Sequence, residues 1–181
     1  MTTATKSKWI IDPSHSEVSF KVKHLMISNV RGVFNEFSGS VSTDGDELLA
    51  DSIEFSLNTT SVDTGSADRD AHLRSADFFD SEKYKTLDFK GKSLKKGDEA
   101  ETFVLEGDLT IKGVSRPVKL NVEFGGKMKD PWGNEKAGYT LSGKINRKDW
   151  GLNWNAALEA GGVLVSDDVA LFCEVQFLKQ A

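Results

Sequence analysis

The sequence is poor in the residues that build disulfides and metal sites. Its 181 residues include one cysteine and three histidines. Cys173 alone cannot form an intrachain disulfide or a zinc–thiolate cluster. His15, His24 and His72 show no His-Glu-x-x-His spacing, so the zinc-protease motif is absent. We therefore expect neither a metal nor another cofactor.

Long apolar runs and an excess of basic charge are also missing. The N-terminus, "MTTATKSKW", shows no apolar stretch, and no transmembrane run follows. We therefore expect a cytoplasmic protein, or a periplasmic one if a signal peptide has been removed. The net charge of −5 argues against a nucleic-acid partner, because nucleic-acid-binding surfaces are basic.

Catalytic motifs are absent as well. The sequence contains no Gly-x-Ser-x-Gly, no P-loop and no Gly-x-Gly-x-x-Gly. His72 lies four residues after Asp68, but such a pair on a helix is usually surface electrostatics. We expect that the protein is not an enzyme. A lipid enzyme that uses His72 is the weakest of the alternatives.

Alternation of apolar and polar residues dominates the rest of the chain, and Phe is the main aromatic residue, with 11 copies. Such alternation predicts strands with one buried face. A short lead at 8–12 precedes eight such runs, at residues 15–25, 28–42, 50–59, 85–94, 102–113, 116–126, 137–147 and 166–179.

The loops between these runs are short and rich in Gly and Asp, which is typical of an antiparallel meander. A single domain over residues 1–181 is expected, mostly β, folded as a closed antiparallel eight-stranded barrel with one or two short helices capping it. The alternation changes phase between Phe34 and Phe37, which predicts a β-bulge at Asn35–Glu36.

Residues 61–80 predict a helix rather than a strand. Thr64 or Ser66 could cap its start, and Asp68–His72 and Asp70–Arg74 are spaced as i,i+4 pairs. The helix could cap one barrel mouth, with Phe78 and Phe79 turned toward the barrel, or it could be a solvated surface helix. Residues 147–165 are mixed, with a helical turn expected over 154–160.

Four glycines fall in phase with the apolar residues of their strands: Gly32, Gly91, Gly107 and Gly143. A glycine on the inner face contributes no side chain, so the four could leave space for a cavity. They could equally mark barrel bends or bulges. If they floor a cavity, replacing Gly107 or Gly143 with Leu would fill it and abolish binding.

Several motifs resemble those of the YceI-like, or polyisoprenoid-binding, family. They are "DPSHSEVSFKVKHL", "VRGVFNEFSG", "SVDTGSADRDAHLRSADFFD", "GDLTIKGVSRPVKLNVEF" and "NRKDWGL", spread over nearly the whole chain in the family's order. The resemblance implies a lipocalin-like barrel that binds or carries a polyisoprenoid, an isoprenoid quinone or a fatty amide or acid. Many members carry a secretion signal, which this N-terminus does not show.

The alternation supplies the candidate ligand-binding residues. They are Phe20, Val22, Phe34, Phe55, Leu57, Phe89, Phe103, Leu105, Leu141, Ile145, Leu171 and Val175, with Trp150 and Trp154 expected to close the mouth. Arg69, His72 and Arg147 are the candidate contacts of a polar head group. Each apolar position could instead be plain core. The alternative function is a structural or interaction protein with a fully packed barrel, and a homodimer is left open.

Overall fold

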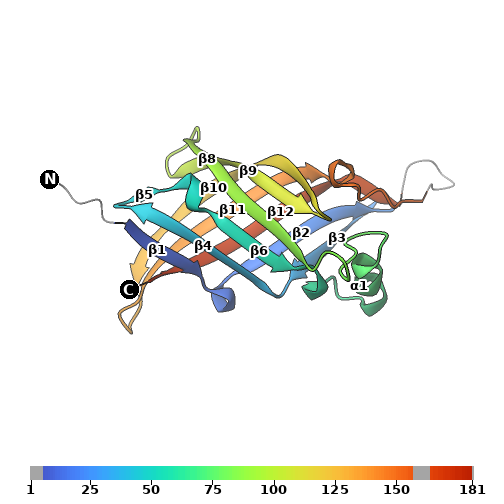
Figure 1. Cartoon of the computed structure of the whole chain (residues 1–181), viewed down its shortest axis with the longest axis horizontal. Helices are drawn as coiled ribbons and strands as arrows, with labels where there is room; N and C mark the ends of the chain where they lie inside the picture. Colours follow the sequence, from blue (N-terminus) through green and yellow to red (C-terminus); the bar gives the residue numbers. More distant parts are fainter. Residues whose placement is uncertain (1–5, 157–163, 181) are drawn as a thin grey trace.

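The structure, a computed structural model, describes residues 6–156 and 164–180 (Figure 1). Within these residues, strands make up most of the chain. They are β1 (Lys6–Ile11), β2 (Glu17–His24), β3 (Ser28–Phe34), β4 (Phe37–Asp44), β5 (Glu47–Leu48), β6 (Glu54–Asn58), β7 (Val62–Asp63), β8 (Thr86–Lys96), β9 (Thr102–Ile111), β10 (Val114–Lys129), β11 (Glu135–Asn146) and β12 (Val165–Lys179).

The strands form one closed antiparallel barrel of eight walls. Five walls are the single long strands β8 to β12, each paired with the next along the chain. The other three are strands in two pieces: β1 and β2 both pair with β12, β3 and β4 pair with β2 and β1, and β7 and β6 pair with β3 and β4. The pairing of β1 with β12 closes the ring, so the predicted eight-stranded meander is confirmed.

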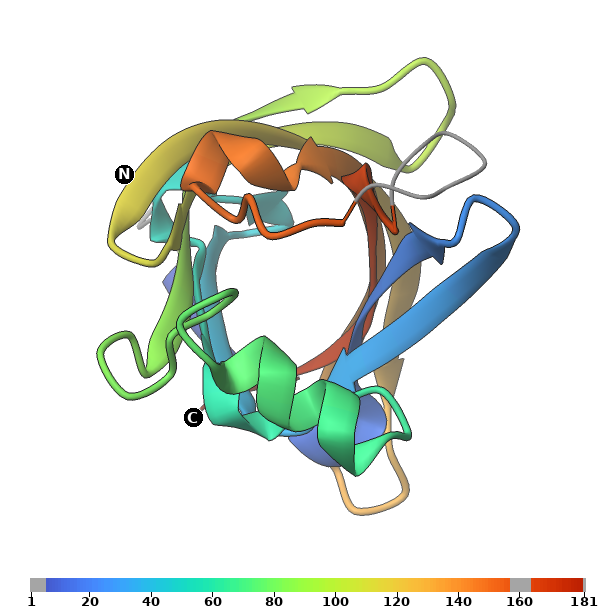
Figure 2. The same ribbon diagram turned by 90° about the vertical axis from the view of Figure 1, so that its right-hand side faces the viewer.

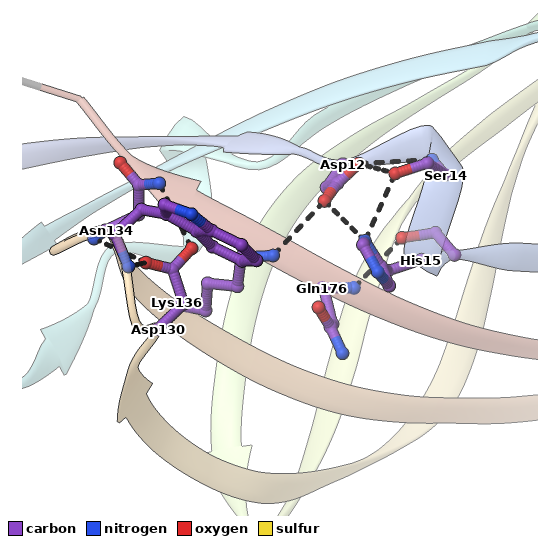
Figure 3. Close-up of polar contacts among 9 residues, drawn as sticks. Asp12, Ser14, His15, Asp130, Asn134, Lys136 and Gln176 are labelled. Atoms are coloured by element: carbon purple, nitrogen blue, oxygen red, sulfur yellow. Dashed lines mark hydrogen bonds and ion pairs between the residues drawn. The ribbon is translucent and has the colours of Figure 1, made fainter.

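A pinned corner joins β1 to β2 (Figure 3). The short 3₁₀ helix η1 (Pro13–His15) interrupts the wall there, and Asp12 caps it. The Asp12 carboxylate accepts hydrogen bonds from the Ser14 hydroxyl at 2.6 Å and from His15 Nδ1 at 2.8 Å. The backbone N–H of Gln176 donates to Ser16 Oγ at 2.9 Å, which links the corner to β12.

The predicted bulge at Asn35–Glu36 is wrong. The chain instead leaves the strand conformation there, so that β3 ends at Phe34 and β4 starts a new piece at Phe37. The neighbouring wall breaks at the same level, at η3 (Thr59–Ser61), and the Asn35 amide donates to the Ser61 carbonyl across the two breaks. Register shifts occur elsewhere, between Gly91 and Ser93 and between Phe124 and Gly126.

The helix α1 (Ala67–Arg74) lies across one end of the barrel, as Figures 1 and 2 show. It is shorter than the predicted 61–80, because β7 and a turn precede it. Ser66 is the N-cap, its hydroxyl accepting from the Arg69 amide. The predicted i,i+4 pairs are wrong. Asp70 accepts from the Thr64 amide and hydroxyl, at 2.8 and 2.6 Å, and Arg74 Nε donates to the Thr60 carbonyl.

The segment after β11 begins with the 3₁₀ helix η4 (Arg147–Trp150), which the sequence did not predict. The helical turn expected over 154–160 is not seen in residues 154–156, and the remainder of that prediction lies outside the described residues. A further 3₁₀ helix, η2 (Ala50–Ser52), lies between β5 and β6.

Candidate ligand-binding cavity

A cavity of about 430 Å³ opens at the α1 end of the barrel. Three segments frame this end in Figure 2: α1, the η4 segment and the hairpin of β2 and β3. Most of the lining is apolar. The lining residues are Phe20, Val22, Val30, Phe34, Leu73, Phe78, Phe79, Leu87, Ile111, Ile145, Leu152, Trp154, Leu164, Val165, Val169 and Leu171, with the polar residues Lys23, His24, Thr64, Asp68, Arg69, His72 and Arg147.

A second cavity of about 160 Å³ lies deeper, within the barrel. Its walls come from the inward positions of nearly every strand, among them Phe55, Leu57, Phe89, Leu105 and Leu141. Six side chains line both cavities: Phe20, Phe34, Leu87, Ile111, Ile145 and Leu171. The mouth cavity and the central cavity are therefore neighbours, and we call the six apolar side chains between them the neck.

Two of the six neck residues, Phe20 and Phe34, belong to a cluster of phenylalanine rings. The Phe20 and Phe34 ring centroids are 5.5 Å apart, and Phe34 meets Phe79 edge-on at 5.7 Å. Phe79 follows α1, so the helix region contributes to the same cluster as the strands.

The inward glycines do not leave empty floor, so that interpretation is wrong. A Cβ at Gly32 would lie 2.4 Å from the Phe20 ring, and one at Gly107 would lie 2.5 Å from the Phe89 ring. Each glycine thus lets a neighbouring ring lie flat against the barrel wall. A Cβ at Gly143 would meet Leu120, and Gly91 borders one of the register shifts.

The polar residues of the mouth are largely held by protein groups. Arg69 donates from Nε to Thr64 Oγ1 and from Nη2 to the Thr64 carbonyl, both at 2.8 Å. His72 Nε2 lies 2.9 Å from the Asp77 carboxylate. The His72 ring also packs edge-on against Phe78 and Trp154, with centroids 5.0 and 4.6 Å away. Both side chains are therefore held in place at the rim by neighbouring protein groups.

Arg147 is buried, with 3 % of its surface exposed, and anchors the segment between β11 and β12. It donates to four backbone carbonyls: Ser166 at 2.9 Å, Leu152 at 2.6 Å, Trp154 at 2.9 Å and Val165 at 3.3 Å. Burial lowers the guanidinium pKa, and the nearby Asp167 carboxylate opposes that effect. A guanidinium has five N–H groups, and its bonds to the described residues use four of them.

Cys173 lines the central cavity. Burial raises the pKa of its thiol to about 11, so the side chain is neutral near pH 7. A neutral buried thiol behaves as a small apolar group and reacts slowly. Cys173 is therefore part of the apolar interior.

A third cavity, of about 730 Å³, occupies the opposite end of the barrel. Aromatic side chains form its floor, and Asp46, Lys96, Glu101 and Lys127 are among the polar residues that line it. The aromatic residues are Trp9, Phe103, Phe124, Tyr139 and Phe177. Only Phe177 is shared with the central cavity.

The structure brings most of the predicted residues together at the first two cavities. Phe103 instead lines the opposite end. Trp150 does not close the mouth: it is 2 % exposed and its indole N–H donates to the Leu109 carbonyl at 2.8 Å. The mouth cavity is lined by the other predicted residues of this end, Trp154, Arg69, His72 and Arg147. The helix α1 also contributes Leu73.

Several lining residues were not among the candidates. Leu87, Ile111 and Val169 lie in phase with predicted residues of their own strands, so the same alternation could have identified them. Leu152 and Leu164 belong to an irregular segment, where no periodicity signals which side chains face inward.

Two further features concern metal binding and membrane spanning. Among the described residues, no three His, Cys, Asp or Glu side chains are grouped so as to hold a metal ion. In the same part of the chain, no helix combines the length and apolar character needed to cross a bilayer.

Comparisons with known proteins agree on one family. The model of the YceI-like domain matches residues 9–177. The protein YceI of Escherichia coli O157:H7 is 43 % identical over 139 residues, which are 76 % of this chain and 71 % of that protein. A crystal structure of a Campylobacter jejuni YceI protein matches with a TM-score of 0.75 and 34 % identity over the whole of both chains.

A more distant match shows the fold alone. A Saccharophagus degradans structure described as a polyisoprenoid binding domain has a TM-score of 0.67 and 17 % identity, and the match covers 98 % of this chain and all of that one.

Proposed function

Because the chain belongs to the YceI-like domain family, we propose that its barrel binds one long apolar molecule, such as a polyisoprenoid, an isoprenoid quinone or a fatty amide or acid. The single observation that carries the proposal is the apolar mouth cavity of about 430 Å³, which adjoins a second apolar cavity inside the barrel at Phe20 and Phe34. Small-molecule sites are typically clefts of roughly 300–1,000 Å³ with mostly apolar walls.

The shape of the cavity favours an elongated ligand. A chain that enters at α1 would thread the neck and end in the central cavity, among Leu105 and Leu141. Removal of each CH₂ from water contributes roughly 0.8 kcal/mol, so a long chain can bind tightly with few polar contacts. Isoprenoids are the first class to test, because a domain named for polyisoprenoid binding shares this fold.

The polar end of the ligand would lie at the mouth. Lys23, Arg69 and Arg147 line this cavity against one carboxylate, Asp68, which favours an anionic or strongly polar head group. Arg147 offers its remaining N–H, and Arg69 offers those that Thr64 does not occupy. The proposed role is binding or carriage without chemical change of the ligand.

A fully packed barrel is the competing function, and the two adjacent cavities weigh against it. The decisive experiment is mass spectrometry of an organic extract from the purified, folded protein, with native mass spectrometry of the same sample. We expect one hydrophobic compound at close to one molecule per chain. A protein that stays empty after incubation with isoprenoid quinones and fatty amides would overturn the proposal.

A matched pair of variants tests whether the ligand binds inside the barrel. Leu171 lines both cavities, whereas its neighbour Phe172 is 41 % exposed on the outside. Leu171→Trp should reduce ligand occupancy strongly, and Phe172→Trp should not. Equal occupancy in both variants would mean that the ligand binds elsewhere.

A further inference from the structure

The turn between β2 and β3 exposes three consecutive apolar side chains. Leu25 is 39 % exposed, Met26 50 % and Ile27 84 %. The turn lies at the α1 end of the barrel, where Figure 2 shows the hairpin beside the mouth. We refer to Leu25–Ile27 as the hairpin tip. Exposure of three adjacent apolar side chains to water is unfavourable, and such a patch typically marks a site of contact with another molecule or with a membrane.

The backbone of the hairpin tip makes this composition harder to explain by folding alone. Leu25 and Met26 both have positive φ, of 53° and 63°, and the Ile27 amide donates to the His24 carbonyl at 3.2 Å. Two successive positive φ values favour Asn and Gly, as in Asn-Gly hairpins. Leu and Met are strained there, so a requirement other than turn geometry explains their presence.

Cationic side chains lie behind the tip. Lys21 and Lys23 are exposed on β2, and Arg31 lies opposite Lys21 on β3. Arg31 pairs with Glu17 at 3.1 Å, but in the part of the chain that the structure describes neither lysine forms an ion pair. An apolar tip followed by free cations matches the depth profile of a bilayer surface, where acyl chains are succeeded by phosphates.

The hairpin tip is also next to the cavity. Lys23 and His24 line the mouth, and the Leu25 amide donates to the carbonyl of Leu164, another mouth residue, at 2.9 Å. We propose that the hairpin tip inserts into the surface of a lipid bilayer and thereby sets the cavity mouth against the lipid. The inference rests on the proposed function for its purpose, since the bilayer would be the source or the destination of the apolar ligand.

Flotation with vesicles of phosphatidylcholine and phosphatidylglycerol tests the inference. The full chain should float with the vesicles, and the variant Leu25→Asn/Met26→Gly/Ile27→Ser should bind them at least about tenfold more weakly. The variant places Asn-Gly in the strained turn, so it should fold at least as stably as the parent. Its melting temperature therefore separates loss of docking from loss of fold.

Two further variants sharpen the result. Lys21→Ser/Lys23→Ser should weaken binding to vesicles that contain phosphatidylglycerol and leave binding to pure phosphatidylcholine unchanged. Met128 and Trp132 are 79 % and 83 % exposed in the β10–β11 hairpin at the opposite end of the barrel (Figure 1), so Met128→Ser/Trp132→Ser is the matched control and should float like the parent.

Three outcomes would overturn the inference. In the first, the parent chain fails to float, and in the second, the tip variant floats as well as the parent. In the third, the parent forms a concentration-dependent dimer and binds no vesicles, and the tip variant is a monomer. Binding of a fluorescent fatty acid to the chain in the absence of vesicles is measured in parallel. If the tip variant still binds that probe, the proposed function stands whatever the vesicles show, and vesicle binding without probe binding would count against the proposed function alone.

Discussion

Gly107 lies beneath the Phe89 ring, and this contact makes a prediction at the scale of a single residue. A Cβ at Gly107 would lie 2.4 Å from the Lys90 carbonyl oxygen and 2.5 Å from the ring. Gly107→Ala should therefore lower the free energy of unfolding by about 1–3 kcal/mol. Gly138→Ala is the matched control, because no atom lies within 4 Å of a Cβ there. Urea denaturation that found the two variants equally stable would contradict the packing described for Gly107.

Asp12 makes a second residue-scale prediction, which concerns acid stability. Hydrogen bonds from Ser14 and His15 lower the pKa of Asp12 from 3.8 to about 2. The contribution of the ionised Asp12 carboxylate to the free energy of unfolding is therefore present above pH 4 and is lost as the pH falls from about 4 through 2. Asp12→Asn should lower the free energy of unfolding at pH 7 by about 2 kcal/mol and should flatten its loss between pH 4 and 2.

Chemical denaturation across that pH range measures the Asp12 effect. The solvent-exposed Asp98 supplies the control, since Asp98→Asn should change neither the stability nor its pH dependence. If Asp12→Asn lost as much of its free energy of unfolding between pH 4 and 2 as the parent does, the corner of Figure 3 would not stabilise the fold through this carboxylate.

Individual residues were predictable from the sequence where they lie in regular strands. Alternation alone placed Phe34, Leu105 and Leu171 on the inner face, because the side chains of a strand point to opposite faces in turn. It could not show that Gly32 would be covered by the Phe20 ring, since that contact joins neighbouring strands and depends on a rotamer. The prediction that Trp150 closes the mouth failed for a related reason. Its indole N–H donates to the Leu109 carbonyl, which is distant in the sequence and is brought close only by the fold.

At the scale of elements, Arg147 holds the segment that joins β11 to β12. Its guanidinium binds four carbonyls from Leu152 to Ser166 and is 3 % exposed. Arg147→Met would remove the guanidinium donor from these buried and partly buried carbonyls, of which that of Val165 keeps a second donor, Asn155 Nδ2 at 2.7 Å. We therefore expect a loss of about 3 kcal/mol in the free energy of unfolding. Hydrogen exchange should also become faster in residues 150–156, which form one side of the mouth.

The control for Arg147 is a pair on the surface. Arg31 contacts Glu17 at 3.1 Å with both side chains more than half exposed, so Arg31→Met should cost less than about 1 kcal/mol. If Arg147→Met were as mild as Arg31→Met, the segment would have to be held by other contacts.

The elements that the sequence predicted least well are those at the mouth. The helix was placed at 61–80 but spans Ala67–Arg74, because β7 and a turn precede it. Thr64 in that turn donates to Asp70 of the helix, which removes Asp70 from the expected pair with Arg74. The hairpin tip was taken as strand through Leu25, since apolar residues carry no turn signal. Local propensity is overridden at these positions, and such departures concentrate where function resides.

At the scale of the whole molecule, the barrel itself was predictable. Eight alternating runs with short connections allow few topologies, and closure removes the exposed edges that an open sheet would keep. The two-piece walls were not foreseen. They arise because β1 with β2, and β3 with β4, bend at Asp12–Ser16 and at Asn35–Glu36, which allows a single wall to follow the curvature of the barrel.

The adjacency of the mouth and central cavities makes a prediction about ligand length. For a series of saturated fatty acids, each added CH₂ should strengthen binding by roughly 0.8 kcal/mol, or about fourfold in Kd, until the chain reaches the end of the central cavity. Beyond that length the gain should stop, because further carbons would lie in water at the mouth. Displacement of a fluorescent fatty acid measures the series.

The position of that plateau tests the route of the chain. Leu105 lines only the central cavity, and Leu73 lines only the mouth. Leu105→Phe should shorten the optimal chain and leave the affinity for short acids unchanged, because short acids would not reach it. Leu73→Phe should weaken all lengths alike, since every ligand would pass the mouth. If Kd did not depend on chain length, or if both variants shifted the plateau equally, the ligand would not extend from the mouth into the centre of the barrel.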